Sequence, residues 1–117
     1  MDETGMGIKI ITGGVTAARA MIYSQEPCRS AGTFTTNIVK AAPVKWDKNQ
    51  VTSGAPARAV VINAGIANAC TGEEGMGYCG QTAEAAALAL GISAESVLVA
   101  STGVIGMQLP MDRITAG

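Results

Sequence analysis

The clearest strand patterns of the chain are two four-residue apolar runs, which lie within residues 57–63 and at residues 97–100. Both are rich in β-branched side chains and end at small or polar residues, which is typical of strands buried inside a sheet. Between them, apolar residues recur every three or four positions over residues 79–90, and Gly91 follows as a helix stop signal. The order strand, helix, strand predicts a βαβ-like unit with helices packed on a sheet.

The N-terminal half has weaker patterns. Short β-prone runs predict strands or extended segments in residues 8–11, 20–23, 32–37 and 39–44. The last of these is expected to be extended because Pro43 disfavours helical conformation in the residue before it. The polar residues 45–50 predict a short helical turn.

The length and composition of the chain indicate one globular α/β domain. At 117 residues it is too short for two domains with separate cores, and 48% of its residues are hydrophobic against 15% charged. Residues 110–113 resemble the opening turn of a helix, although the sequence stops at Gly117. We therefore expect residues 1–117 to be a single, truncated, N-terminal part of a longer domain.

Charge, cysteine and histidine content narrow the function. A net charge of −1 with scattered basic residues argues against nucleic-acid binding, and no apolar run approaches the about 20 residues of a membrane span. The three cysteines have no CxxC spacing, which favours reduced thiols and a cytoplasmic location. The chain contains no histidine, so it cannot complete a Ser-His-Asp triad, and we expect no metal site and no cofactor.

The strongest candidate site is the sequence STGVIG at residues 101–106, which follows the second apolar run. Glycine lets the backbone approach a ligand and direct its N–H groups outward, and a threonine hydroxyl beside such an N–H supplies a second donor. Thr102 and Gly103 could therefore stabilise an oxyanion. The alternative from the residues alone is a tight turn without a ligand.

Other polar residues are weaker candidates. Asn63 and Asn68 follow the first apolar run and could orient a polar ligand beside a substrate, although loop asparagines more often bond to the backbone. The polar residues 35–37 could line a cleft or simply form a turn. Glu73 and Glu74 are more typical of an exposed helix start, and Cys70 and Cys79 of buried structural thiols.

Five segments, in this order, together resemble the ornithine acetyltransferase family, the bifunctional glutamate N-acetyltransferases of arginine biosynthesis. They are GGVTAA at 13–18, AGTFTTN at 31–37, VKAAPV at 39–44, NAGIANACTG at 63–72 and STGVIG at 101–106. The resemblance covers the chain from about Gly13 onward. It implies an N-terminal-nucleophile-like αββα sandwich, of which this chain is the N-terminal part of the α chain.

The resemblance also implies a mechanism. Family members cleave themselves into α and β chains, and the new N-terminal threonine of the β chain is the nucleophile, with its own amine as base. The acetyl group moves from N-acetylornithine to glutamate through an acetyl-threonine, and some members also use acetyl-CoA. Thr102 and Gly103 match the oxyanion-stabilising pair, and no metal is required. The nucleophile lies outside this chain, so we expect the chain to need a β-chain partner and to be inactive alone.

Two other functions remain open from the sequence. One is an aminopeptidase-like hydrolase of the same fold, in which water accepts the acyl group. The other is a non-catalytic α/β module that binds a ligand through residues 63–68 and 101–106. An oxyanion forms in both acyl-transfer reactions, so the Thr102–Gly103 pair does not separate transferase from hydrolase.

Overall fold

The fold was analysed in a computed structural model, which describes residues 8–13 and 19–116. The side chains of residues 8–13 are not described, and residues 14–18 of the first family-like segment lie outside the described residues. In chain order the elements are β1 (Ile8–Gly13), β2 (Arg19–Cys28), α1 (Ala42–Ser53), β3 (Ala57–Ile66), α2 (Gly72–Leu90), the 3-10 turn η1 (Ala94–Ser96), β4 (Val97–Val104) and α3 (Met111–Thr115).

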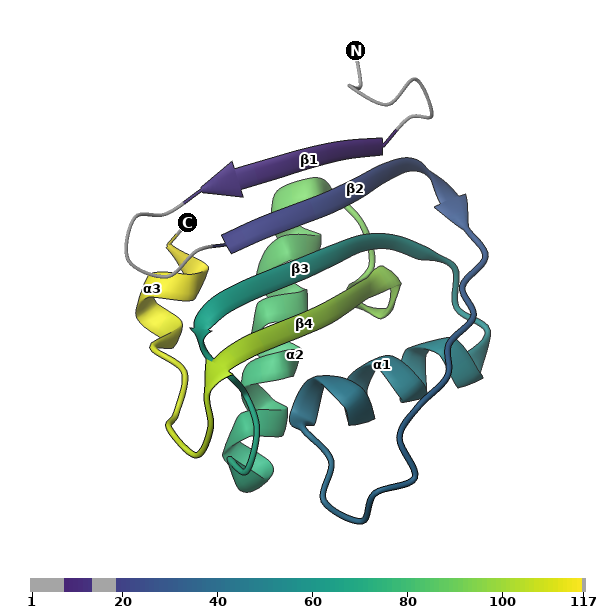
Figure 1. Cartoon of the computed structure of the whole chain (residues 1–117). Coiled ribbons are helices and arrows are strands. Elements are labelled where there is room, and N and C mark those ends of the chain that lie inside the picture. The colour runs from purple at the N-terminus through teal and green to yellow at the C-terminus, as the bar shows by residue number, and fades with distance from the viewer. Residues whose placement is uncertain (1–7, 14–18, 117) are drawn as a thin grey trace.

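The four strands form one mixed sheet in the order β1-β2-β3-β4. β1, β2 and β3 are antiparallel neighbours, whereas β3 and β4 run parallel with α2 between them in the chain. Figure 1 shows α2 crossing behind the sheet and α1 beside the β4 edge. The predicted strand–helix–strand unit is confirmed, and its two strands and its helix are each longer than the apolar patterns that predicted them.

The core lies between α2 and one face of β3 and β4. Cys79, Ala83 and Ala86 on α2 are buried together with Val97 and Val99 on β4. Small side chains on the helix let its axis come close to the sheet, which is how the chain builds a core with few aromatic residues. The helix ends as predicted at Gly91, whose φ of 68° is the left-handed conformation of a helix cap.

The other face of the sheet is apolar and, among the described residues, no helix covers it (Figure 1). Residues alternate along β3, so that Val61 is buried under α2 while Val60 and Ile62 are only half-buried. Ile22, the partner of Val60 on β2, is 37% exposed. One helical layer on one sheet is half of an αββα sandwich, in agreement with a partial domain of that class.

Two sequence predictions in the N-terminal half are wrong. Residues 32–37 form no strand, and residues 42–44 are helical rather than extended. Pro43 lies in the first turn of α1, where its missing N–H costs nothing because the first amides of a helix have no intrahelical partner. The preceding residue, Ala42, donates its N–H to the carbonyl of Asn68 at 3.1 Å, and this long-range contact outweighs the local preference.

Side chains of α1 occupy the open edge of β4. The indole N–H of Trp46 donates to the carbonyl of Val97 at 3.0 Å. The carboxylate of Asp47 accepts the N–H of Val99 at 2.9 Å. These contacts satisfy backbone groups that a further strand would otherwise pair, and so protect the sheet edge.

The partial burial of Asp47 makes the stability of the protein depend on pH. Burial raises the pKa of Asp47 from 3.8 to about 6, against the opposing effect of the Val99 N–H. The folded protein therefore holds the proton more tightly than the unfolded chain does. The contribution of the protonated Asp47 carboxyl to the free energy of unfolding is complete below pH 3.8, and it is lost as the pH rises through about 6.

We predict that Asp47→Asn, which keeps an acceptor oxygen for Val99 but cannot ionise, changes the pH dependence of unfolding. The difference in free energy of unfolding between variant and wild type, measured by urea denaturation, should move in favour of the variant between about pH 4.5 and about pH 7.5. A difference that stays constant over this range would contradict the assignment.

Candidate active site

The two candidate segments, 63–68 and 101–106, lie side by side at the ends of β3 and β4. The parallel register pairs Ala64 with Thr102 and Gly65 with Gly103. Both segments begin inside their strands rather than after them, since β3 extends to Ile66 and β4 to Val104. The structure therefore places Thr102 and Gly103 near the C-terminal end of strand β4, and not in a loop after it.

Glycine is required where the two strands touch. Gly65 and Gly103 have φ angles of 113° and 129°, which side-chain-bearing residues rarely adopt. A Cβ on Gly103 would lie 2.3 Å from the carbonyl carbon of Gly65 and 2.7 Å from the nitrogen of Ile66. The close passage of the two backbones thus fixes the path of the chain through Thr102 and Gly103.

The alternation of β4 sets the directions of the two donors. The carbonyl of Val97 and the N–H of Val99 point to the open sheet edge, where they bond to side chains of α1. The carbonyl of Val104 points to the β3 side, where it accepts the N–H of Ala67. By this alternation the N–H of Gly103 is directed toward the open edge, away from β3. Thr102 is exposed, and its position places its side chain on the face that α1 and α2 leave uncovered.

Asn63 and Asn68 lie on the helix-covered side of the same strand ends. The amide of Asn63, which is 6% exposed, donates to the carbonyl of Ile66 at 2.8 Å. Asn68 is 1% exposed, and its amide donates to the carbonyl of Gly75 at 2.7 Å and to the Sγ of Cys79 at 3.3 Å. Both amides bond to the chain itself, and the prediction that they lie beside a substrate stays a prediction.

The remaining candidates are spread over the surface. Residues 35–37 are exposed coil, in which the hydroxyl of Thr35 accepts the N–H of Asn37. Glu73 and Glu74 are exposed in the first turn of α2, as expected for a helix start. None of these residues is bonded to the ends of β3 and β4 in the described part of the chain.

The cysteines divide into one buried and two exposed thiols. Cys79 is fully buried, as predicted, and burial, followed by the nearby Asp47 carboxylate, raises the pKa of its thiol to about 12. The prediction of burial is wrong for Cys70, which is exposed. Cys70 sits in the turn before α2 with a φ of 56°, and this conformation turns it out of the core.

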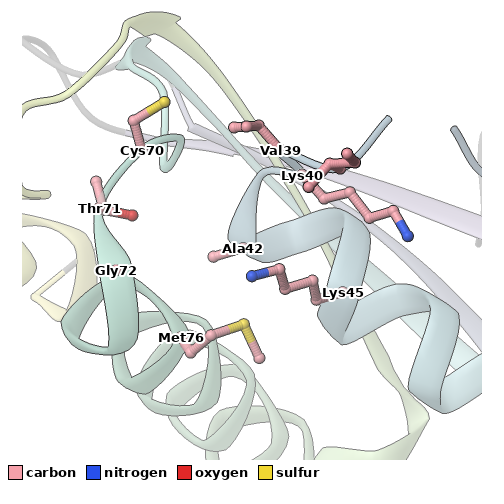
Figure 2. A pocket seen from close by; sticks show the side chains of 9 residues that line it. Val39, Lys40, Ala42, Lys45, Cys70, Thr71, Gly72 and Met76 are labelled. Atoms are coloured by element: carbon pink, nitrogen blue, oxygen red, sulfur yellow. The ribbon is translucent and has the colours of Figure 1, made fainter. Parts of the chain in front are cut away.

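A shallow pocket of about 170 Å³ lies between the first turns of α1 and α2. Figure 2 shows the ammonium of Lys45 reaching from α1 toward α2, with Met76 below it and Cys70 and Thr71 on the far side. Sequence reasoning missed this pocket because its walls come from separate segments that only the tertiary fold brings together. Among the described residues, no group of three or more His, Cys, Asp or Glu side chains could hold a metal ion, and no helix is long and apolar enough to cross a membrane.

Comparison with known proteins identifies the family. The whole chain, residues 1–117, matches the profile of the ArgJ family. The chain belongs to the ArgJ family. It is 52% identical over 99 residues to the arginine biosynthesis bifunctional protein ArgJ of Thermotoga neapolitana, an alignment that covers 83% of this chain and 25% of the relative. It is 54% identical over 98 residues to ArgJ of Symbiobacterium thermophilum, covering 84% of this chain and 24% of that protein.

Solved ArgJ structures have the same fold. The crystal structure of ornithine acetyltransferase from Mycobacterium tuberculosis, complexed with ornithine, superposes with a TM-score of 0.86 at 42% identity, over 95% of this chain and 63% of that one. ArgJ from Bacillus halodurans superposes with a TM-score of 0.81 at 38% identity, over 86% and 53%. The α/β fold class and the family resemblance are confirmed. The chain spans about a quarter of the length of the curated ArgJ relatives.

We predict that Gly103→Ala disrupts the strand ends, because the added Cβ meets the Gly65 backbone and the φ angle is unfavourable. Gly106→Ala is the matched control: it has a positive φ of 84°, but nothing lies within 4 Å of its added Cβ. In the full-length protein, Gly103→Ala should lower the free energy of unfolding by about 2 kcal/mol more than Gly106→Ala does. Equal losses in chemical denaturation would show that crowding against Gly65 is unimportant.

Proposed function

We propose that the complete protein is an acetyltransferase of arginine biosynthesis, which moves an acetyl group from N-acetylornithine to glutamate through an acetyl-threonine. Its relatives are named as arginine biosynthesis bifunctional proteins, and one structural neighbour is an ornithine acetyltransferase bound to ornithine. In this proposal the present chain supplies Thr102 and Gly103 as the oxyanion-stabilising pair, and a β chain supplies the threonine nucleophile.

The observation that carries the proposal is the arrangement of the two donors at the end of β4. The Gly103 N–H is directed toward the open edge, and the Thr102 hydroxyl is exposed beside it. The backbone there is held by its pairing with β3 and by the bond from the Ala67 N–H to the Val104 carbonyl, so the donors are oriented before a substrate arrives. Preorganised donors of this kind stabilise a developing negative charge without reorganising during the reaction.

The chemistry follows from these donors. The hydroxyl of the N-terminal threonine attacks the acetyl carbonyl of N-acetylornithine and gives its proton to its own amine. The carbonyl oxygen becomes an oxyanion that accepts hydrogen bonds from Thr102 Oγ and the Gly103 N–H. Collapse breaks the C–N bond, ornithine leaves with the proton, and an acetyl ester remains. The amine of glutamate then attacks this ester through a second oxyanion, which yields N-acetylglutamate and the free threonine.

Family membership favours this reaction over the two alternatives. A hydrolase would use the same donors with water as acceptor, but the named relatives are biosynthetic proteins. A binding module without catalysis is disfavoured because a structural neighbour at 42% identity is named as an ornithine acetyltransferase, which is an enzyme. The transfer as written exchanges an acetyl group between nitrogen and oxygen, and it needs no cofactor or metal.

The proposal includes a partner and a cellular location. We propose that a precursor cleaves itself to give α and β chains that stay associated, and that this chain belongs to the α part and is inactive alone. Acetyl-CoA is a second possible donor in this scheme, since its thioester passes through the same oxyanion. A cytoplasmic setting suits the three free cysteines.

We predict that Thr102→Ala in the full-length enzyme slows formation of the acetyl-threonine by about 10²-fold or more, with little change in KM for N-acetylornithine. The reason is that the hydroxyl bonds more strongly to the oxyanion than to the ground-state carbonyl. Thr102→Ser keeps the hydroxyl and should retain most of the rate. Single-turnover acetylation, followed by mass spectrometry, measures both; an unchanged rate in Thr102→Ala would remove Thr102 from the site.

A further inference from the structure

Ser101 precedes Thr102 on β4, and its side chain points to the opposite, helix-covered face of the sheet. Its hydroxyl accepts the N–H of Asn68 at 2.9 Å and donates to the carbonyl of Ile66 at 3.2 Å. One side chain therefore ties β4 to the last residue of β3 and to the segment that follows it. These bonds add to the backbone ladder of the sheet, because both are made by the side chain of Ser101.

A second anchor lies on the other side of Thr102 and Gly103. The N–H of Ala67 donates to the carbonyl of Val104 at 2.9 Å. The peptide between Thr102 and Gly103, which carries the proposed N–H donor, is thus held from both ends by the same short segment. Fixing the two ends leaves little freedom for the direction of the N–H between them.

The segment that holds β4 is itself rigidly supported. Asn68 is almost completely buried, accepts the hydroxyl of Thr71 at 2.5 Å and bonds to the carbonyl of Gly75 in α2. A Cβ on Gly75 would lie 1.9 Å from the Thr71 hydroxyl and 2.5 Å from the Asn68 oxygen, so α2 packs directly against this cluster. Ser101 therefore connects the oxyanion donors to the buried core.

We propose that Ser101 is a positioning residue, which holds Thr102 and Gly103 in the direction needed to stabilise the oxyanion. The inference rests on the proposed function, since it assigns Ser101 a role in the same site. Ser101 faces away from the uncovered side of the sheet, so it acts through its neighbours and does not touch the substrate.

The test is single-turnover acetylation of the full-length enzyme by N-acetylornithine, with the rate expressed per active site so that a loss of folded protein is not counted. Ser101→Ala should slow acetylation by about tenfold or more with KM nearly unchanged, and Ser101→Thr should restore most of the rate. The control is Ser93→Ala, the same substitution at the N-terminal side of β4, where the hydroxyl accepts the N–H of the nearby Glu95 and bonds to no described residue of β3. Its rate should equal that of the wild type.

A double variant separates positioning from a general structural effect. If Ser101 acts through Thr102 and Gly103, then Ser101→Ala should slow the Thr102→Ala enzyme by a smaller factor than it slows the wild type, because one of the two donors that it positions is already gone. Full multiplication of the two effects, or a wild-type rate in Ser101→Ala, would overturn the positioning role while the proposed function stands. If Thr102→Ala itself is as fast as the wild type, the proposed oxyanion role fails, and this inference fails with it.

Discussion

The contact between the backbones of Gly65 and Gly103 determines the rest of the site. The parallel strands β3 and β4 pair past their apolar segments at a point where a Cβ on Gly103 would meet the Gly65 backbone and where both glycines have positive φ angles. Continuation of the strands, in turn, brings the two glycine-containing segments together and orders the chain around Thr102. A substitution here would change the local stability and the donor geometry together.

The open edge of β4 has two uses along its length. At Val97 and Val99 it is closed by Trp46 and Asp47 of α1, which satisfies the backbone and prevents pairing with another strand. Beyond the reach of these side chains no other described strand pairs with this edge, and there the Gly103 N–H is directed outward. The protein thus covers the β4 edge at Val97 and Val99, and in the proposed mechanism the end of the same strand stabilises the oxyanion.

The parts of the fold that the sequence predicts are those fixed by local pattern. The apolar runs of β3 and β4 and the three-to-four spacing of α2 identify these elements, since each buries a regular face. The ends of β3 and β4 were not predictable, because Gly65 and Gly103 resemble loop residues until the opposite backbone is known. The start of α1 was missed for a similar reason: the bond from Ala42 to Asn68 joins residues far apart in the sequence.

The candidate site was predictable in its residues but not in its arrangement. Thr102 and Gly103 stand out as a hydroxyl next to a glycine, and the ordered family-like segments strengthen that interpretation. Asn68 and Ser101 also have polar side chains and lie in the same two segments. Only the structure shows that these side chains lie on the helix-covered face of the sheet and bond to backbone groups. Alternation along β4 places Ser101 on the helix-covered face once the strand is known to extend that far, whereas Asn68 follows Gly65, whose positive φ ends any simple alternation.

The most direct test of the account is a crystal structure of the complete enzyme with a phosphonate analogue of the tetrahedral acetyl-transfer intermediate bound at the threonine nucleophile. The account predicts that one phosphonate oxygen lies about 2.7–3.1 Å from both Thr102 Oγ and the Gly103 nitrogen, on the side of the sheet that α1 and α2 leave uncovered. An oxygen held by other donors, with Thr102 and Gly103 out of hydrogen-bond reach, would contradict it.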